Sequence, residues 1–250
     1  MTSAFDVLGI GNAIVDVISR ADDSFLKQHE LTKGSMMLID EARAEKLYAA
    51  MGSGVEVSGG SCGNTMAGVA SFGGKGAYIG KVRNDQLGQV FGHDIRAIGV
   101  SFETAPATSG PATARCLISV TPDAQRTMST YLGACTGLGP DDIDEKRVAS
   151  AQVTYVEGYL WDAPEAKKAV LKAFDAAHAA GRLVSITLSD SFCVGRYRDE
   201  FRDLIRNKVD ILFGNESEIT SLYQVDSFEK AMEAARQEAK IAALTRSEKG

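Results

Sequence analysis

Cysteine and histidine are scarce in this chain, which has four cysteines and three histidines among its 250 residues. The cysteines are widely separated and form no C-x-x-C pair. This spacing excludes the disulfide framework of a small secreted domain, so we expect reduced thiols with a structural role. The chain also contains neither H-E-x-x-H nor a Cys/His zinc spacing, which argues against a zinc site.

Basic clusters and long apolar runs are missing as well. The formal net charge is −6, and lysine and arginine do not gather into the positive patch that binds nucleic acid. No apolar run reaches membrane-spanning length, and the N-terminus carries no secretion signal. We therefore expect a cytoplasmic protein without a nucleic-acid or membrane partner.

The sequence does contain a regular alternation of apolar and amphipathic runs. Hydrophobic residues make up 44% of the chain, which is enough for a large buried core. The alternation predicts an α/β fold, with a mostly parallel sheet covered by helices on both faces. The predicted strands, each followed by its helix, are 77–80 and 85–98, 153–156 and 164–180, 183–187 and 197–207, and 209–213 with a helix from 216.

Glycines are concentrated in residues 55–88. The pair Gly59-Gly60 precedes Ser61, and such glycines let backbone N–H groups approach a ligand without a Cβ in the way. The sequence predicts a helix from Asn64, so this loop would end at the positive end of a helix, where hydroxyl or anionic groups bind well. We expect a small polar ligand here.

Three segments, in this order, carry a family resemblance: 5–16, 59–64 and 209–218. The first is an apolar strand with a polar extension, the second holds the glycine pair, and the third is a strand that runs into Asn-Glu-Ser-Glu. The ordered triplet resembles the ribokinase-like (PfkB) family of carbohydrate and nucleoside kinases. Within that family, segment 11–17 is most similar to the adenosine kinase branch.

The resemblance implies a three-layer αβα ribokinase-like fold across residues 1–250, with a mostly parallel central sheet. Segments 17–40 and 112–131 read as hairpin strands, the second around a Thr121-Pro122-Asp123 turn, and in the resembled family such strands form a small β-sheet lid over the substrate. The implied cofactors are ATP and Mg²⁺, and the implied reaction phosphorylates the 5′-hydroxyl of adenosine. We expect a monomer or homodimer.

Other acceptors and other functions stay open at this point. A related sugar kinase acting on ribose or fructose is the first alternative. A non-catalytic nucleoside-binding fragment is a more distant one.

By the resemblance, the substrate is held by Asn12, Asp16, Gly60, Ser61 and Asn64. Asp16 follows a strand end, where open α/β sheets gather ligand contacts. A carboxylate there can accept two hydrogen bonds from a vicinal diol, which is how the resembled family holds sugar hydroxyls. Without the resemblance, an exposed acidic turn residue is the simpler interpretation of Asp16.

The resemblance also implies phosphate-side contacts after the last two predicted strands. Asn215 is expected to bind the nucleotide and Glu218 to act on Mg²⁺ through water, which suits a cation that dehydrates reluctantly. Asn at the N-cap with Glu at N3 is equally a helix capping box, and the two interpretations are compatible. Thr245 and Gly250 resemble the ends of a nucleotide-contacting T-x-G-x-x-G turn, in which Ser247 replaces the middle glycine.

Arg126 lies after the turn of segment 112–131, where the adenosine kinase branch carries an arginine that closes on the transferring phosphoryl group. A guanidinium suits that charge, although an exposed hairpin arginine is an equally simple interpretation. The family's catalytic aspartate lies in a G-A-G-D motif, which is absent from residues 1–250. We therefore expect the catalytic base and much of the adenine pocket to lie in a C-terminal segment beyond Gly250.

The glycine loop also fits a rival motif. Residues 59–63 match G-x-S-x-G, the nucleophile elbow of α/β hydrolases, with Ser61 as the nucleophile. That elbow needs a histidine on a late loop, whereas the last histidine, His178, lies inside a predicted helix. A serine hydrolase is therefore the remote alternative to a kinase.

Overall fold

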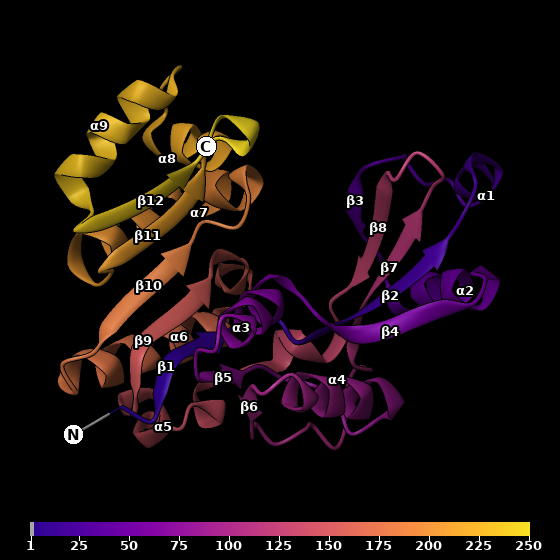
Figure 1. The fold of residues 1–250 in the computed structure, drawn as a ribbon, viewed down its shortest axis with the longest axis horizontal. Helices are drawn as coiled ribbons and strands as arrows, with labels where there is room; N and C mark the ends of the chain where they lie inside the picture. The colour runs from indigo at the N-terminus through magenta and orange to yellow at the C-terminus, as the bar shows by residue number, and fades with distance from the viewer. Residues whose placement is uncertain (1–2) are drawn as a thin grey trace.

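The computed structural model of the protein describes residues 3–250, which form two β-sheets and the helices around them (Figure 1). Seven strands form the large sheet, in the spatial order β12-β11-β10-β9-β1-β5-β6, and all neighbouring pairs are parallel. The strands are β1 (Phe5–Ile10), β5 (Gly76–Ile79), β6 (Ser101–Phe102), β9 (Ala151–Glu157), β10 (Leu183–Thr187), β11 (Ile211–Asn215) and β12 (Ile241–Thr245). The strand order reverses between β1 and β9, so their carboxyl ends border the crevice where open α/β sheets bind ligands.

The small sheet has five strands in the order β3-β8-β7-β2-β4, and Figure 1 shows it projecting to one side of the large sheet. Its pairings are mixed, because β2 is parallel to β7 and antiparallel to β4, while β7 is antiparallel to β8. Its strands are β2 (Ile14–Arg20), β3 (Met36–Leu38), β4 (Gly54–Gly59), β7 (Ala114–Val120) and β8 (Arg126–Tyr131).

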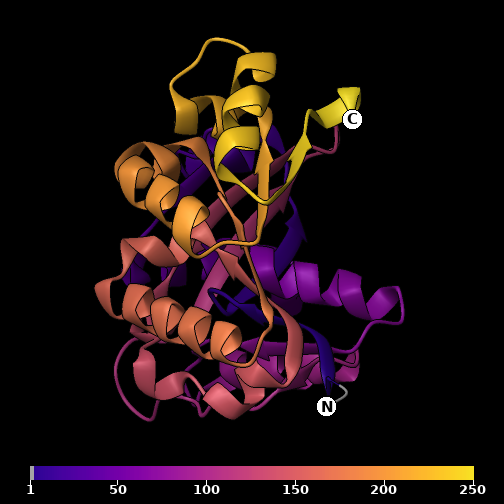
Figure 2. The same ribbon diagram turned by 90° about the vertical axis from the view of Figure 1, so that its left-hand side faces the viewer.

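Helices pack on both faces of the large sheet, with two separate buried cores. The first core contains residues of α5 (Glu145–Ala149), α6 (Pro164–Ala179), α7 (Ser191–Asn207), α8 (Glu216–Tyr223) and α9 (Phe228–Glu238). The second contains residues of α3 (Ser61–Ser71), α4 (Gln86–Ala97), α1 (Asp23–Gln28) and α2 (Glu41–Ala50). In Figure 2 the orange helices lie on one side of the strands and a purple helix on the other.

The predicted three-layer α/β fold, with a parallel central sheet and a small second sheet, is therefore confirmed. Short 3₁₀ helices complete the chain: η1 (Gly133–Gly137), η2 (Pro140–Asp142), η3 (Gly158–Asp162) and η4 (Ser247–Lys249). No helix within residues 3–250 is long and apolar enough to span a membrane. All four cysteines are free and buried.

Two boundaries near the glycine pair differ from the sequence prediction. Residues 54–59 form β4, which pairs with β2, and α3 begins at Ser61 rather than at Asn64. Gly60 is the N-cap of α3, and the Asn64 N–H donates to the Gly60 carbonyl oxygen over 2.9 Å. The first helical turn therefore ends, rather than begins, at Asn64.

The prediction that residues 17–40 form hairpin strands is wrong. The segment holds the end of β2, helix α1 and strand β3, and β2 and β3 are not neighbours in the sheet. The Asp22 carboxylate explains the helix, because it accepts a hydrogen bond from the Phe25 N–H over 2.8 Å and so caps α1. By contrast, β7 and β8 within 112–131 do pair with one another.

Two later boundaries also shift. Helix α7 begins at Ser191 rather than near Tyr197, because the Asp190 carboxylate caps it by accepting from the Cys193 N–H over 2.6 Å. Tyr197 has non-helical backbone angles, so α7 contains a kink at the residue where the sequence placed its start. Strand β11 begins at Ile211 rather than at Val209.

Candidate functional site

Asn12 and Asp16 lie where the chain passes from the large sheet to the small one. Asn12 follows β1 at the strand-order reversal and is buried, whereas Asp16 lies on β2. In the register of the small sheet, Asp16 is beside Val57 of β4 and Cys116 of β7. The structure thus brings both predicted substrate residues to the boundary between the two sheets.

The Asp16 carboxyl group is partly desolvated. Burial raises its pKa from 3.8 to about 6, against the lowering effects of a hydrogen bond with the Asn64 side chain and of the Arg126 charge. A Cβ on Gly59 would lie 2.2 Å from the Asp16 Cγ, so only glycine lets the carboxylate pack this closely on β4. At neutral pH Asp16 is therefore an ionised acceptor in a partly dry site, which suits hydroxyl donors.

Gly60 and Ser61 form the turn from β4 into α3. Gly60 has φ +79°, and a Cβ on it would lie 2.6 Å from the Asn12 carbonyl oxygen, so both conformation and space require glycine. The Ser61 and Asn64 side chains are exposed in the first turn of α3. These predicted contacts thus meet at a helix N-terminus, whose partial positive charge favours hydroxyl or anionic groups.

Arg126 is the first residue of β8, and its side chain is exposed. The pairing of β8 with β7 puts Arg126 opposite Val120, which lies on the same face of β7 as Cys116. Because Cys116 is the neighbour of Asp16, Arg126 lies on the Asp16 face of the small sheet. Its charge lowers the pKa of Asp16, in agreement with this placement.

The Asp16 face of the small sheet also carries exposed apolar side chains. Their exposed fractions are 38% for Ile18, 47% for Met36, 62% for Leu38 and 61% for Val55. The strand register places all four on this face, while α1 and α2 contribute to the buried core that holds Val15 and Val17. Asp16 is therefore a polar group within an open apolar surface, an arrangement that suits a ligand with both hydroxyls and an apolar body.

Asn215 and Glu218 form a capping box at the start of α8. The Asn215 Oδ1 accepts from the Glu218 N–H over 2.9 Å, and the Glu218 Oε2 accepts from the Asn215 N–H over 3.0 Å. The Asn215 Nδ2 also donates to the Glu218 Oε1 over 2.7 Å. Glu218 is 5% exposed, and burial, with the nearby Asp190 charge, raises its pKa.

The Glu218 and Asp190 carboxylates fit a divalent cation that keeps part of its water shell. A buried Glu218 beside the negative Asp190, with no lysine or arginine contributing to its electrostatics, lacks a compensating charge. Within residues 3–250, no three His, Cys, Asp or Glu side chains cluster into a complete metal site. A cation here would therefore take its remaining ligands from water and from phosphate oxygens.

Strand β12 ends at Thr245, which lies beside Asn215 in the parallel register of β11 and β12. In the turn that follows, the Arg246 N–H donates to the Gly250 carbonyl oxygen over 2.6 Å. Ser247, which replaces the family's glycine, has φ +53°, and Gly250 has φ +96°. The backbone thus keeps the left-handed conformation that glycine favours, even though the residue is serine.

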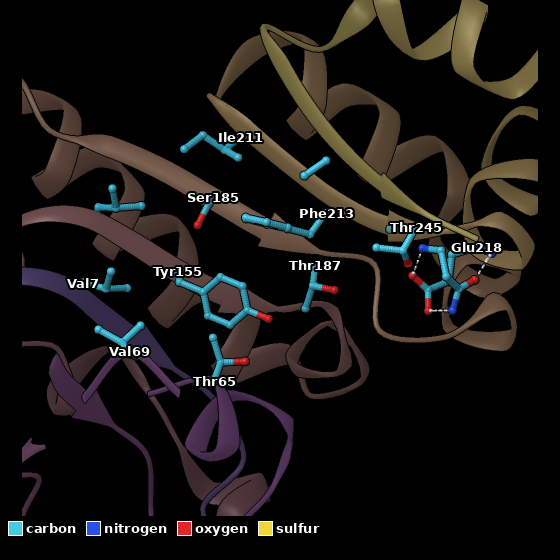
Figure 3. Close-up of a pocket in the computed structure, with 14 residues that line it drawn as sticks. Val7, Thr65, Val69, Tyr155, Ser185, Thr187, Ile211, Phe213, Glu218 and Thr245 are labelled. Carbon is cyan, nitrogen blue, oxygen red and sulfur yellow. Dashed lines mark hydrogen bonds between the residues drawn. The ribbon is translucent and has the colours of Figure 1, made fainter. Parts of the chain in front are cut away.

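A cavity of about 560 Å³ extends from α3 to the start of α8 (Figure 3). The predicted nucleotide and metal residues Asn215, Glu218 and Thr245 line it, whereas none of the predicted substrate-binding residues does. Thr65 and Val69 of α3 border it at one end, and Asn215, Glu218 and Thr245 border it at the other. Between them lie side chains of β9, β10 and β11: Val153, Tyr155, Ser185, Thr187, Ile211 and Phe213. Helix α3 therefore faces the same space as the predicted nucleotide and metal residues. Gly250 does not line this space.

Comparison with known proteins decides the family. The description "pfkB family carbohydrate kinase" matches residues 31–250. The chain belongs to this family. The chain superposes on a probable sugar kinase from Rhizobium etli CFN 42 with TM-score 0.92 and 57% identity, covering 100% of this chain and 76% of that one. It superposes on adenosine kinase from Sinorhizobium meliloti with TM-score 0.90 and 56% identity, covering 98% and 76%.

More distant relatives differ in their named acceptors. The chain is 24% identical over 233 residues to guanosine-inosine kinase of Escherichia coli (strain K12), and 25% identical over 235 residues to adenosine kinase 2 of Arabidopsis thaliana. These matches cover 88% and 89% of this chain but 53% and 66% of the relatives. The chain thus spans about half to two thirds of their length, and the match assigns the family rather than the acceptor.

In this member of the pfkB family the G-x-S-x-G match lacks the partners of a nucleophile elbow. The Ser61 Oγ donates to the Glu157 Oε2 over 2.6 Å, and no histidine of residues 3–250 hydrogen-bonds to it. His178 lies in α6 with its Nε2 3.1 Å from the Asp210 Oδ2. Without a histidine to take its proton, Ser61 is not activated, and we drop the serine hydrolase alternative.

The sequence prediction missed Glu157, the last residue of β9. Its side chain is 1% exposed and accepts hydrogen bonds from the Ser61 hydroxyl and the Cys62 N–H. The signal was present, because the strand-end position that singled out Asp16 applies equally to a glutamate that follows the apolar run 153–156.

Proposed function

We propose that this pfkB kinase transfers the γ-phosphoryl group of ATP to the 5′-hydroxyl of adenosine. The position of Asp16 among exposed apolar side chains of the small sheet carries this proposal. A ribose offers a vicinal diol to the carboxylate, and an attached purine offers an apolar face to Ile18 and Val55. A free sugar leaves that apolar surface in water. The likeness to adenosine kinase from Sinorhizobium meliloti, at 56% identity, supports the same acceptor.

On the acceptor side, Asp16 binds the ribose diol. Asn12, Gly60, Ser61 and Asn64 bind the remaining polar groups and orient the 5′-hydroxyl. The small sheet serves as a lid, so its closure expels water and aligns the hydroxyl with the donor.

On the donor side, Asn215, Thr245 and Gly250 bind the nucleotide, and Arg126 neutralises charge on the transferring phosphoryl group. Glu218, with Asn215, would hold Mg²⁺ through its waters. When bound, that ion neutralises charge on the phosphate oxygens. In the resembled family the base that takes the hydroxyl proton belongs to a G-A-G-D motif, which residues 1–250 do not contain. Turnover is therefore measured with a chain that contains this motif (the full-length protein).

A sugar kinase acting on ribose or fructose is the second candidate. The likeness to the probable sugar kinase from Rhizobium etli CFN 42, at 57% identity, favours it. The two candidates share the diol contact at Asp16 and differ in whether the apolar surface beside it is used.

Binding of the acceptor separates these candidates. We expect titration calorimetry on the full-length protein to give a dissociation constant for adenosine at least a hundredfold below those for ribose and fructose. The binding heat capacity for adenosine should be negative, because apolar surface is buried. Tighter binding of either free sugar would replace adenosine by the sugar as the acceptor.

A further inference from the structure

Glu157 holds two separate segments with one buried carboxylate. Its Oε1 accepts from the Asn12 N–H over 2.7 Å. Its Oε2 accepts from the Ser61 hydroxyl over 2.6 Å and from the Cys62 N–H over 3.0 Å. The side chain is 1% exposed, so both oxygens are committed to protein donors and little surface is left for a substrate.

The three donors lie where the chain crosses between the small sheet and the layers of the large sheet. Asn12 lies in residues 11–13, which link β1 of the large sheet to β2 of the small sheet. Ser61 and Cys62 begin α3, which Gly60 links to β4 of the small sheet. Glu157 belongs to β9, the strand beside β1 at the strand-order reversal. One side chain of the large sheet therefore fixes both connections that carry the proposed acceptor contacts.

No cationic group within residues 3–250 contributes to the electrostatics of Glu157. The hydrogen-bond donors named above offset the effect of burial, which nevertheless raises its pKa. The titratable groups that feel its charge are two cysteines and three tyrosines: Cys62, Cys135, Tyr78, Tyr155 and Tyr159. Burial raises the pKa of each of them, so they stay neutral at physiological pH. Since a buried, unpaired carboxylate is costly, the N–H groups and the α3 N-terminus are what stabilise it.

The neighbouring chain is shaped around this carboxylate. A Cβ on Gly11 would lie 2.4 Å from the Cys62 Cβ and 2.8 Å from the Glu157 Oε2. The connection after β1 therefore packs directly on the carboxylate and on α3, with no room for a side chain between them.

We propose that Glu157 is a positioning residue that fixes the segments of Asn12 and Ser61 against the large sheet. In this way it sets where the acceptor alcohol stands relative to the donor end of the cavity at Asn215 and Thr245. This role depends on the proposed function only for the identity of the acceptor. The contacts that Glu157 makes with both segments do not depend on it.

Glu157→Gln in the full-length protein tests this role, because the amide places an N–H₂ group against N–H or O–H donors. We expect the KM for adenosine to rise roughly 10- to 100-fold while the KM for ATP changes less than threefold. Hydrogen exchange of the Asn12 and Cys62 amides should become at least tenfold faster. Unchanged exchange at both amides, or an unchanged KM for adenosine, would overturn the proposal.

Asp210→Asn is the matched control. Asp210 is a buried carboxylate at the opposite end of the same sheet, and it accepts from the Val184 N–H over 2.9 Å. This variant should speed exchange of the Val184 amide and lower the Tm while leaving the KM for adenosine as in the wild type. A rise in that KM as large as in Glu157→Gln would assign both effects to general destabilisation and overturn the proposal.

Ser61→Ala keeps the test open if Glu157→Gln does not fold. This change removes the hydroxyl that donates to Glu157 and leaves no donor without an acceptor. Ser61 itself does not hydrogen-bond to Asn12, which donates to the other oxygen of Glu157. We expect the Asn12 amide to exchange faster in Ser61→Ala, because within residues 3–250 Glu157 is the only link between the two residues that the substitution alters. Unchanged exchange of this amide would overturn the proposal. If the wild type does not phosphorylate adenosine at all, the proposed function fails, and the exchange rates still decide the role of Glu157.

Discussion

At the scale of single residues, the proposed recognition of the acceptor depends most on the Asp16 side chain. It is partly desolvated and has lost water partners that a diol can replace. Asn64 lies within hydrogen-bonding reach of it, and Gly59 leaves room for it. A polar group kept in such a place on an apolar face is more consistent with binding than with folding stability.

Asp16→Ala should therefore weaken adenosine binding by about 1.5–3 kcal/mol, the cost of losing charge-assisted hydrogen bonds. Titration calorimetry on the full-length protein measures this directly. Asp23→Ala is the control, because Asp23 is an exposed carboxylate at the first residue of α1 and pairs with Lys33. Equal adenosine affinity in the wild type and Asp16→Ala would reduce Asp16 to an acidic strand residue.

The pH dependence of binding should report the same carboxylate. Because the pKa of Asp16 is about 6, the ionised acceptor is present above pH 6 and is lost below it. Adenosine affinity should fall as the pH drops from 7 to 5, and Asp16→Asn should remove this dependence. Folding stability has the opposite sign: for a raised pKa, the stabilising contribution is present below the unfolded value of 3.8 and is lost as the pH rises through about 6.

At the scale of elements, the capping box of α8 has two roles that one substitution separates. Glutamine at N3 preserves a capping box, so Glu218→Gln should keep the Tm of the wild type, whereas Asn215→Ala should lower it. Loss of the negative charge should still raise the Mg²⁺ concentration for half-maximal activity roughly tenfold, the scale of effects on metal binding from supporting groups. An unchanged Mg²⁺ titration would leave Asn215 and Glu218 with only the capping role.

A substitution in the turn after β12 tests whether the left-handed conformation of Ser247 lowers the stability of the fold. A left-handed residue other than glycine costs about 1–2 kcal/mol, and glycine costs roughly 0.5–1 kcal/mol in chain entropy. Ser247→Gly should thus raise the free energy of unfolding by about 0.5–1 kcal/mol, with no gain in Ser247→Ala, as measured by chemical denaturation. Equal stability of Ser247→Gly and the wild type would mean that this turn stores no strain.

The elements that the sequence predicts well are those with a clear period. The helix near 164–180 and the strand at 183–187 are found within one residue of the prediction, because their apolar positions repeat regularly. Strand β4 was missed because glycines at both of its ends and polar side chains between them weaken the strand signal. The start of α3 was missed because its N-cap is Gly60, whose positive φ has no side-chain signature.

Some residues of the candidate site could also be predicted from the sequence, and others could not. Asp16 and Asn215 could be found from their places near strand ends, because Asp16 follows β1 by a few residues and Asn215 is the last residue of β11. The register then shows Thr245 beside Asn215. Glu157 carries the same strand-end signal and could have been named as a candidate. Its proposed positioning role could not be predicted, because that role depends on contacts with residues 96 and 145 positions away in sequence. The apolar face around Asp16 depends on a sheet register that no single segment encodes.

At the scale of the whole molecule, the proposed acceptor and donor contacts lie mainly on different elements. The small sheet, the connection after β1 and the start of α3 carry the proposed acceptor contacts, while β11, β12 and α8 carry most of the proposed donor contacts. Arg126, on β8 of the small sheet, is the exception, because it is proposed to act on the transferring phosphoryl group. The cavity between α3 and α8 is lined at its centre by side chains of the large sheet. In the proposed mechanism, closure of the small sheet moves Asp16 and Arg126 relative to the donor contacts of the large sheet.

The most direct test is the product formed when acceptors compete. The full-length protein, supplied with ATP, Mg²⁺ and equal concentrations of adenosine, ribose and fructose, should yield AMP as the dominant phosphorylated product by mass spectrometry. AMP formation should stop when ATP is omitted, since the γ-phosphoryl group of ATP is transferred. Ribose phosphate or fructose phosphate as the dominant product would contradict the assignment of adenosine as the acceptor.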